Sequence, residues 1–399
     1  MLLSHAVKCF SRPVSTGRRF FSPATSNIVV KSAADALRAG AETASLYPVT
    51  FIDNAKSGSD ALVNLVAVPW DCTMCNFDHT DPSIHKTPGV LLEKSHALDN
   101  VDFDLHEVGL AAPFRFGIHF DDSLTEPMSA LNLEATKILH PQHVFEQCTE
   151  APATTKSDWQ QVDKLWRQQA ELLEAKFSSN LQSGQLSGCI GGDHSSSFGA
   201  MKAFGAHCKE QGESFGILQI DAHLDLYDVY DGLQCSHACV MKRVLDEVDN
   251  LDSFVAVGIR ECGEEEVQRS FEDPRHHIFS AADLRRATLS AQSWSTYAQK
   301  IVEKLPQNVW VTLDIDGLDI EYCPGTGTPV PGGLSYFQAV DLLLEIVRSG
   351  RVLCGWDLVE VGSNAAAVNV GARLAYKLAG LQMVGVGAQD SIPLQTRGV

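Results

Sequence analysis

The chain has 399 residues, of which 44% are hydrophobic and 20% are charged, a composition typical of a globular protein. Its formal net charge of −19 argues against nucleic acid as a partner, because phosphate binding requires a basic surface. No run approaches the roughly 18 consecutive apolar residues needed to cross a bilayer, so we expect no membrane partner. An acidic chain is compatible with a small cationic ligand.

The first 26 residues differ in composition from the rest of the chain. They contain four basic residues and five serines, and the first acidic residue is Asp35. This composition is typical of a mitochondrial transit peptide, so residues 1–26 are predicted to direct the protein to the mitochondrial matrix. No linker divides the remainder, and we expect residues 27–399 to form a single domain with an extended N-terminal region, 27–180.

Short apolar runs alternate with amphipathic segments from about residue 62 onward. The predicted strands are 62–68, 186–190, 215–220, 254–259, 309–315, 352–358 and 381–387. Continuous apolar strands alternating with helices indicate a parallel sheet that is covered on both faces. The predicted fold class is therefore α/β, a three-layer α/β/α sandwich with a central, mainly parallel sheet.

Two segments have the apolar spacing of helices, 158–181 and 336–347. In the second, Phe337, Val340, Leu344 and Val347 are predicted to face the core. Residues 71–155, rich in His, Asp and Pro, are expected to form loops over the sheet. The eleven cysteines lack regular spacing, and we interpret the Cys72/Cys75 pair as structural because no second pair completes a zinc site.

Three clusters of acidic and histidine residues follow predicted strands, at residues 189–197 (CIGGDHSSS), 219–225 (QIDAHLD) and 312–317 (TLDIDG). The carboxyl ends of parallel strands meet at one edge of a sheet, where ligands bind. Alternate residues of an extended segment point the same way, so the side chains within each cluster can converge. The clusters provide six candidate ligands: His194, Asp221, His223, Asp225, Asp314 and Asp316.

Four carboxylates and two imidazoles are too many for a tetrahedral structural zinc site. They suit two harder divalent cations, and oxygen-rich ligation favours manganese over zinc. Packing four acids together without a cation would be costly, because their charges repel one another and resist burial. Two bound cations can activate water as a nucleophile, so the clusters predict metal-assisted hydrolysis and leave phosphoryl, acyl and amidine substrates open.

The ordered motifs GGDHS (191–195), DAHLD (221–225), DIDGLD (314–319) and PGTGTP (324–329) resemble the ureohydrolase family of arginases and agmatinases over roughly residues 186–387. The resemblance implies a three-layer α/β fold and two Mn²⁺ per chain, with nickel and cobalt as open alternatives. It also implies a homo-oligomer, either a trimer or a hexamer.

The resemblance assigns the ligands and three catalytic residues. One ion would be held by His194, Asp221, Asp225 and Asp314, and the other by Asp221, His223, Asp314 and Asp316. Asp225 would also orient the nucleophile that the ions share. Glu360 would bind the substrate guanidinium, which suits paired hydrogen bonds from a carboxylate. His237 would contact substrate and transfer protons at the mouth of the site, although Ala238 replaces the glycine that usually follows it.

The sequence favours a decarboxylated guanidino substrate over arginine. Gly263, in the turn 258–263 (GIRECG), stands where arginases place an acid for the α-amino group. The stretch 226–236 lacks a Ser/Asn-rich carboxylate-binding segment, and Tyr227, Tyr230, Asp228 and Asp231 would tolerate a distal amine. We therefore expect an agmatinase-like enzyme that cleaves agmatine to urea and putrescine, with guanidinobutyrate, guanidine, arginine and formiminoglutamate as alternatives.

Two further hypotheses come from other classes. A different two-metal hydrolase would leave Glu360 without a guanidinium partner. A non-catalytic assembly subunit would be expected to lose ligands, whereas all six ligand types are present. Residues 361–365 (VGSNA) and Ala367 depart from the family pattern. These departures concern the expected substrate pocket more than the expected metal ligands.

Overall fold

The structure, a computed structural model, describes residues 50–52, 58–73, 84–141, 144, 154–290, 292–390 and 392. The predicted transit segment 1–26 and Cys75 lie outside these residues. Within them, eight strands form one sheet in the order β2-β1-β3-β8-β7-β4-β5-β6, and every neighbouring pair is parallel. The strands are β1 Val63–Ala67, β2 Ile118–Asp121, β3 Leu186–Ile190, β4 Phe215–Ile220, β5 Leu251–Val257, β6 His276–Phe279, β7 Asn308–Asp314 and β8 Val352–Val359.

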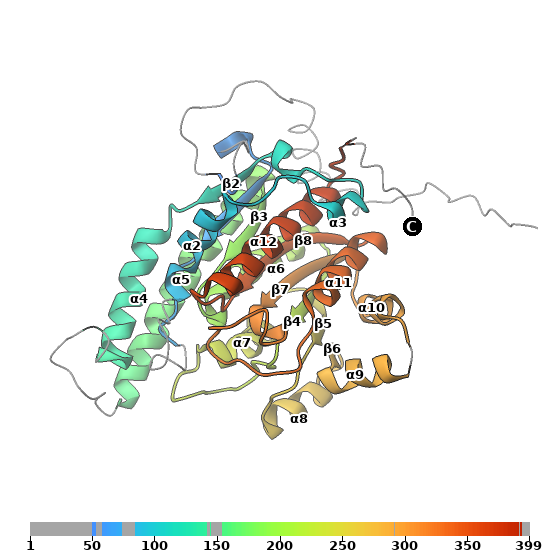
Figure 1. Cartoon of the computed structure of the whole chain (residues 1–399). Coiled ribbons are helices and arrows are strands. Elements are labelled where there is room, and N and C mark those ends of the chain that lie inside the picture. Colours follow the sequence, from blue (N-terminus) through green and yellow to red (C-terminus); the bar gives the residue numbers. More distant parts are fainter. Residues whose placement is uncertain are drawn as a thin grey trace, which may run out of the picture.

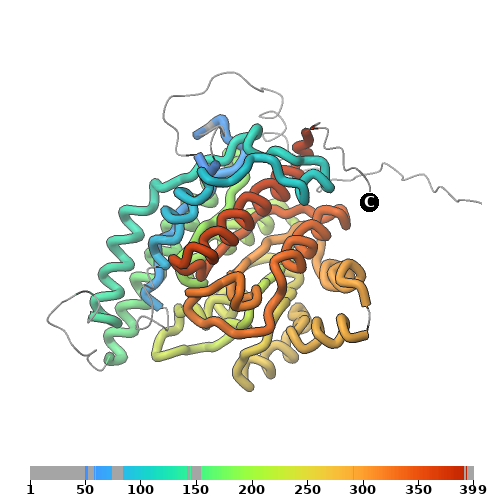
Figure 2. The backbone as a smooth tube through the Cα atoms, in the orientation of Figure 1, coloured from blue at the N-terminus to red at the C-terminus, as the bar shows by residue number. Residues whose placement is uncertain are grey.

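Helices cover both faces of the sheet (Figure 1). One layer contains α2 Thr87–Ser95, α10 Trp294–Val302, α11 Tyr336–Arg348 and α12 Ala365–Gly385. The opposite layer contains α4 Thr125–Leu139, α5 Lys156–Ser183, α6 Phe198–Gln211 and α7 Val240–Glu247. Figure 2 shows α2 running beside α12, although the two helices are far apart in the sequence. The predicted three-layer α/β/α sandwich is confirmed.

Shorter helices complete the described chain: α3 Phe103–His106, α8 Glu264–Glu272 and α9 Ala281–Leu289, with 3₁₀ turns η1 Gly58–Asp60, η2 Ile84–Lys86, η3 Pro113–Phe116, η5 His194–Ser197, η6 His237–Cys239 and η7 Ile315–Gly317. Local signals define the ends of the long helices. Thr155 and Asp158 form a capping box at the start of α5, and Gly184 ends it in the left-handed conformation.

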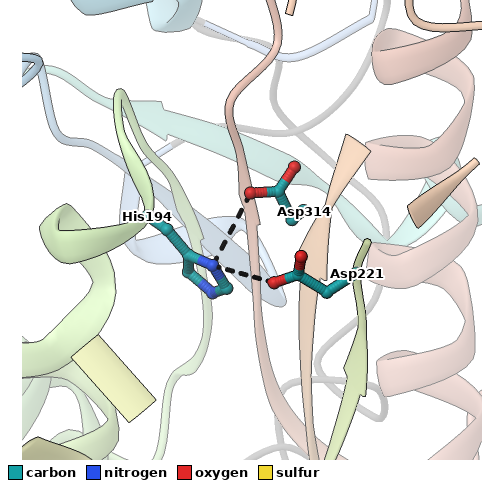
Figure 3. A group of neighbouring side chains, drawn as sticks. All are labelled: His194, Asp221 and Asp314. Carbon is teal, nitrogen blue, oxygen red and sulfur yellow. Dashed lines mark ion pairs between the residues drawn. The ribbon is translucent and has the colours of Figure 1, made fainter. Parts of the chain in front are cut away.

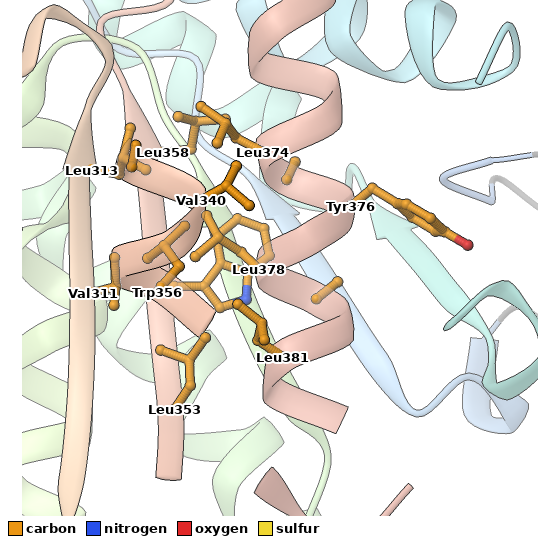
Figure 4. Close-up of a cluster of buried hydrophobic side chains, with 14 of the residues drawn as sticks. Val311, Leu313, Val340, Leu353, Trp356, Leu358, Leu374, Tyr376, Leu378 and Leu381 are labelled. Atoms are coloured by element: carbon orange, nitrogen blue, oxygen red, sulfur yellow. The ribbon is translucent and has the colours of Figure 1, made fainter. Parts of the chain in front are cut away.

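The alternation of side chains along the central strands divides the core in two. Val311 and Leu313 of β7, with Trp356 of β8, pack against leucines of α12 (Figure 4). Trp310, one position away, points to the other face, where its ring centroid lies 5.7 Å from that of Phe204. Because alternate residues face opposite sides and both sides are covered, the central strands are apolar at most positions on both faces, which is why they could be recognised in the sequence.

Several predictions about secondary structure were wrong. Residues 381–387, predicted as a strand, form the end of α12 and the residues after it. This helix is apolar on nearly every side, so periodicity could not distinguish it from a buried strand. Residues 71–155 contain α4 and the edge strand β2 rather than mostly loops. Strand β6 was also missed, and Phe337, predicted to face the core, is 70% exposed.

In the described part of the chain, every helix is too short or too polar to cross a bilayer.

The edge strand β6 buries a histidine that gives the fold a dependence on pH. The His276 ring stacks on Phe254 at a centroid distance of 4.4 Å, and neither ring nitrogen has a hydrogen-bond partner among the described residues. Burial lowers the pKa of His276 from 6.5 to about 4. The imidazole therefore binds a proton more tightly in the unfolded chain than in the folded one. The free energy of unfolding decreases as the pH falls from 6.5 towards 4.

We expect His276→Phe to remove this acid sensitivity. The free energy of unfolding of the wild type should fall below that of the variant as the pH decreases, with a difference that grows by up to about 3 kcal/mol between pH 6.5 and 4. Urea denaturation of both proteins at several pH values in this range measures the difference in the free energy of unfolding. A difference that does not change with pH would contradict the assignment.

Candidate active site

The site lies at the carboxyl ends of four neighbouring strands in the middle of the sheet. His194 opens η5 directly after β3, Asp221 follows β4, Asp314 ends β7 and Glu360 follows β8. In the sheet these strands are adjacent, in the order β3-β8-β7-β4. The sheet order thus brings together segments separated by more than a hundred residues, at the edge where ligands of parallel sheets bind.

One group of ligand atoms surrounds the imidazole of His194. Its Nδ1 lies 3.2 Å from Asp221 Oδ2, 2.9 Å from Asp225 Oδ2 and 3.6 Å from Asp314 Oδ2. Figure 3 shows Asp221 and Asp314 directed at the same nitrogen from two different strands. Ligand atoms of His194, Asp221 and Asp314 all lie within 4.8 Å of one another, a spacing that could hold a metal ion.

A second group shares Asp221 with the first. His223 Nδ1 lies 3.1 Å from Asp316 Oδ2 and 3.6 Å from Asp221 Oδ1. These three residues again offer ligand atoms within 4.8 Å of one another. The structure therefore places five of the six predicted ligands in two overlapping groups, and the sixth, Asp225, lies beside the first group, 2.9 Å from His194 Nδ1. It places Asp221 between the groups as expected, whereas Asp314 belongs by this criterion to the first group alone.

The electrostatics of the cluster fit a cation. The four aspartates are between 0% and 6% exposed. Burial, together with the charges of Asp316 and Asp221, raises the pKa of Asp314 well above its usual value, and burial and Asp221 raise the pKa of Asp225 to about 7. These shifts reflect repulsion that divalent cations would relieve. His194 Nδ1 is buried and faces the carboxylate oxygens of Asp221, Asp225 and Asp314, an arrangement that suits a shared cation.

A polar chain below the cluster orients His194 for metal binding. Thr312 Oγ1 donates to Asp357 Oδ1 at 2.7 Å and lies 2.9 Å from His194 Nε2. Because the hydroxyl proton is already donated to Asp357, Thr312 accepts a hydrogen bond from Nε2–H, which leaves the Nδ1 lone pair directed at the carboxylates. Trp310 Nε1 donates to the other oxygen of Asp357 at 2.7 Å.

The sequence analysis did not identify Thr312 and Asp357 as members of this series of hydrogen bonds. Both residues are fully buried in otherwise apolar strands and face each other in the register of β7 and β8. A polar residue inside a continuous apolar strand can be recognised in a sequence, and it indicates a buried hydrogen bond. To predict that Thr312 and Asp357 bond to each other, the order of the strands in the sheet would also have been needed, and the sequence alone does not give that order. Gln219, likewise buried, donates to Asp221 Oδ2 at 2.8 Å.

Glu360 lies beside the metal ligands. Its Oε1 accepts a hydrogen bond from the backbone N–H of His194 at 2.9 Å, and its own N–H donates to Gly192 at 2.8 Å. Burial and the charge of Asp193 raise the pKa of Glu360 well above its usual value. Glu360 and Asp225 adopt positive φ angles of 59° and 55°. This conformation is strained for residues other than glycine and is concentrated at functional sites.

A cavity of about 610 Å³ opens onto the cluster. It is lined by five of the predicted site residues: His223, Asp225, His237, Asp314 and Glu360. Tyr227 and Tyr230 also line it, as predicted, whereas Asp228 and Asp231 do not. Asp228 instead forms an exposed ion pair with Arg269 at 2.6 Å.

His237 is buried and less basic than an ordinary histidine. Burial lowers its pKa to about 4, so its imidazole is neutral at neutral pH and can accept a proton. Its backbone N–H donates to Thr73 Oγ1 at 3.1 Å, and the edge of its ring faces Tyr230 at a centroid distance of 5.6 Å. His237 thus lies in the wall of the cavity, where a contact with substrate is possible.

The opposite wall of the cavity is anchored by Arg260. Its guanidinium donates to the carbonyl oxygen of Asp316 at 2.6 Å and, through Nε, to that of Val330 at 3.1 Å. Thr328 in the same loop donates to Asp316 Oδ2 at 3.3 Å. The loop that follows β7 is thereby held against both the metal ligands and the cavity.

A parallel α/β sandwich with two overlapping groups of divalent-cation ligands beside a substrate-sized cavity defines a metal-dependent hydrolase. A sequence profile of the Arginase family matches residues 125–384, and the chain belongs to this family. It is accordingly a ureohydrolase, an enzyme that hydrolyses guanidino compounds.

Individual relatives agree with this assignment. The N(1)-aminopropylagmatine ureohydrolase of Thermus thermophilus is 35% identical over 218 residues, which cover 54% of this chain and 69% of the relative. The agmatinase of Pyrococcus horikoshii is 28% identical over 191 residues, covering 47% and 60%. The crystal structure of the agmatine ureohydrolase of Thermoplasma volcanium has the same fold, with a TM-score of 0.59 and 20% identity over 88% of this chain and 98% of that chain.

The role of Thr312 can be tested by metal binding. Thr312→Val should weaken the affinity for Mn²⁺ by about 10- to 100-fold, because the imidazole of His194 loses the group that orients it. Thr312→Ser keeps the hydroxyl and should stay close to the wild type. Isothermal titration of metal-free protein measures both. Equal affinities of the valine variant and the wild type would contradict this role.

Proposed function

We propose that the protein uses two Mn²⁺ ions to hydrolyse agmatine to urea and putrescine. The observation that carries this proposal is the position of Glu360, a buried carboxylate that lines the cavity next to the metal ligands. A carboxylate can form paired hydrogen bonds with a planar guanidinium, and would hold the carbon to be attacked beside the cluster. The mitochondrial location and the trimeric or hexameric state stay predictions.

The outer cavity favours a substrate that ends in an amine. Among the described lining residues other than the predicted ligands and Glu360, the acidic side chains are Glu261 and Glu266, and there is no lysine or arginine. A distal carboxylate would meet like charge there, whereas an ammonium group would be attracted. A second candidate substrate is N(1)-aminopropylagmatine, after which a 35% identical relative is named, because it is also cationic and lacks a carboxylate.

The residues of the site can be assigned to the steps of hydrolysis. Bound divalent cations would activate water as the nucleophile. Glu360 would hold the guanidinium while Asp225, buried at 2.9 Å from His194, accepts a proton from the attacking water. Attack on the guanidinium carbon is followed by breakage of its bond to the substituted nitrogen. The proton that Asp225 took from the water would be relayed by the neutral imidazole of His237 to the departing amine, and the carbon that keeps the water oxygen leaves as urea.

Gly263 and Tyr227 support discrimination against arginine. A Cβ atom at position 263 would lie 2.4 Å from the Tyr227 hydroxyl, so a larger residue cannot be added there unless the tyrosine moves. Tyr227 is hydrogen-bonded to Glu266, which also accepts the backbone N–H groups of Leu226 and Gly263 at 2.8 and 2.7 Å. The wall is therefore fixed, and no acid projects from position 263 to bind an α-amino group.

A substrate panel tests the proposal directly. Manganese-loaded full-length protein should release urea from agmatine with a kcat/KM at least about 100-fold above that for arginine. Glu360→Gln should lower kcat/KM for agmatine by about 100-fold or more while two metals stay bound. Glu345→Gln, at another buried glutamate far from the cavity, is the matched control. Absence of urea with every guanidino compound would refute the proposal.

The fit between Gly263 and Tyr227 can be tested by a double-mutant cycle. Gly263→Ala should raise the KM for agmatine about tenfold, because the added methyl group displaces the tyrosine ring. Adding Tyr227→Phe removes the nearest atom and should recover part of this loss. Steady-state urea release gives the four KM values. Strictly additive effects would show that the two residues do not act on each other.

A further inference from the structure

The segment that follows β1 packs directly against the loop carrying His194, although it precedes the residues matched by the family profile. The Asp193 N–H donates to the Trp70 carbonyl at 2.8 Å. A Cβ atom on Gly192 would lie only 1.8 Å from that same oxygen, so the approach requires glycine. Residues 70–73 thus form one side of the His194 loop.

Thr73 joins this loop to the one that carries His237. Its Oγ1 donates to Asp193 Oδ2 at 2.7 Å, and its backbone N–H donates to the same oxygen at 3.1 Å. The lone pairs of Oγ1 accept the backbone N–H of His237 at 3.1 Å. The hydroxyl of Thr73 therefore donates to one loop and accepts from the other. The residue is buried, with 8% of its surface exposed.

The far side of the segment is held by α4. The backbone N–H groups of Asp71 and Cys72 donate to Asn132 Oδ1 at 2.9 and 3.1 Å, and Asn132 Nδ2 donates to Asp71 Oδ1 at 2.8 Å. Three hydrogen bonds thus fix the backbone directly before Thr73. With its own backbone constrained, Thr73 can define the positions of the two loops that it bridges.

Asp193 transmits this constraint to the metal ligand. Its Oδ1 accepts the backbone N–H of Ser195 at 3.0 Å, while Oδ2 is occupied by Thr73. His194 lies between these two residues, so its backbone is held from both sides. The bridge therefore connects the loop of a predicted metal ligand with the loop of the residue proposed to transfer the proton.

We propose that Thr73 is a positioning residue that sets His237 relative to the His194 loop. This gives a role to the stretch that follows β1, because Thr73, next to Cys72, bonds to both loops of the site. The effect on catalysis rests on the proposed function of His237. The effect on the two loops does not, because it follows from the hydrogen bonds alone.

Hydrogen exchange of metal-free, full-length protein tests the structural half of this inference. Thr73→Val keeps the shape of the side chain and removes both hydroxyl bonds, so amides in peptides covering residues 190–197 and 233–240 should exchange about tenfold faster. Thr73→Ser keeps the hydroxyl and should match the wild type. Thr136→Val is the matched control, because Thr136 is equally buried at 8% and bonds within α4. Unchanged exchange in both peptides would overturn the inference.

Kinetics test the catalytic half, with whichever guanidino compound the wild type hydrolyses fastest. Thr73→Val should lower kcat about tenfold with little change in KM, and Thr73→Ser should stay within about twofold of the wild type. A kcat for Thr73→Val equal to that of Thr136→Val would overturn the positioning role. If the wild type releases no urea, the proposed function fails, and the exchange experiment still decides whether Thr73 holds the two loops.

Discussion

The burial of four aspartates around two imidazoles is the constraint on which the rest of the site depends. Carboxylates this close repel one another, and in a nearly dry environment the repulsion is weakly screened. A proton on His223 adds positive charge on one side of the cluster, because Asp221 and Asp316 raise the pKa of this imidazole to about 12. Such a cluster is stable only with additional positive charge, so the fold is built to hold cations at the carboxyl ends of its central strands.

The surrounding structure supports this cluster in layers. Thr312 and Asp357 fix the orientation of one imidazole, Gln219 holds the shared aspartate, and Arg260 anchors the loop beyond Asp316. These groups hold the ligands in place through direct hydrogen bonds or through one intermediate residue. The strained backbone at Asp225 is consistent with a site in which geometry is imposed by the scaffold.

The sequence predicted the chemistry of the site better than its surroundings. The six ligands lie in short motifs directly after apolar strands, so strand ends alone indicated that they converge. The same reasoning could not order the strands, and therefore missed that Thr312 faces Asp357. It also mistook the end of α12 for a strand, because a helix buried on all sides has no polar face to reveal its period. The short edge strands β2 and β6 carry too few residues for a pattern to emerge.

The place of β8 in the sheet has a consequence for how the enzyme is made. Among the described strands it comes last along the chain, yet it lies between β3 and β7 and is the one that joins the two halves of the sheet. His194 is on one half and the remaining metal ligands are on the other. A growing polypeptide emerging from the ribosome therefore cannot assemble the cation-binding cage before β8 has been synthesised, and the complete set of ligands forms only after this strand has entered the sheet.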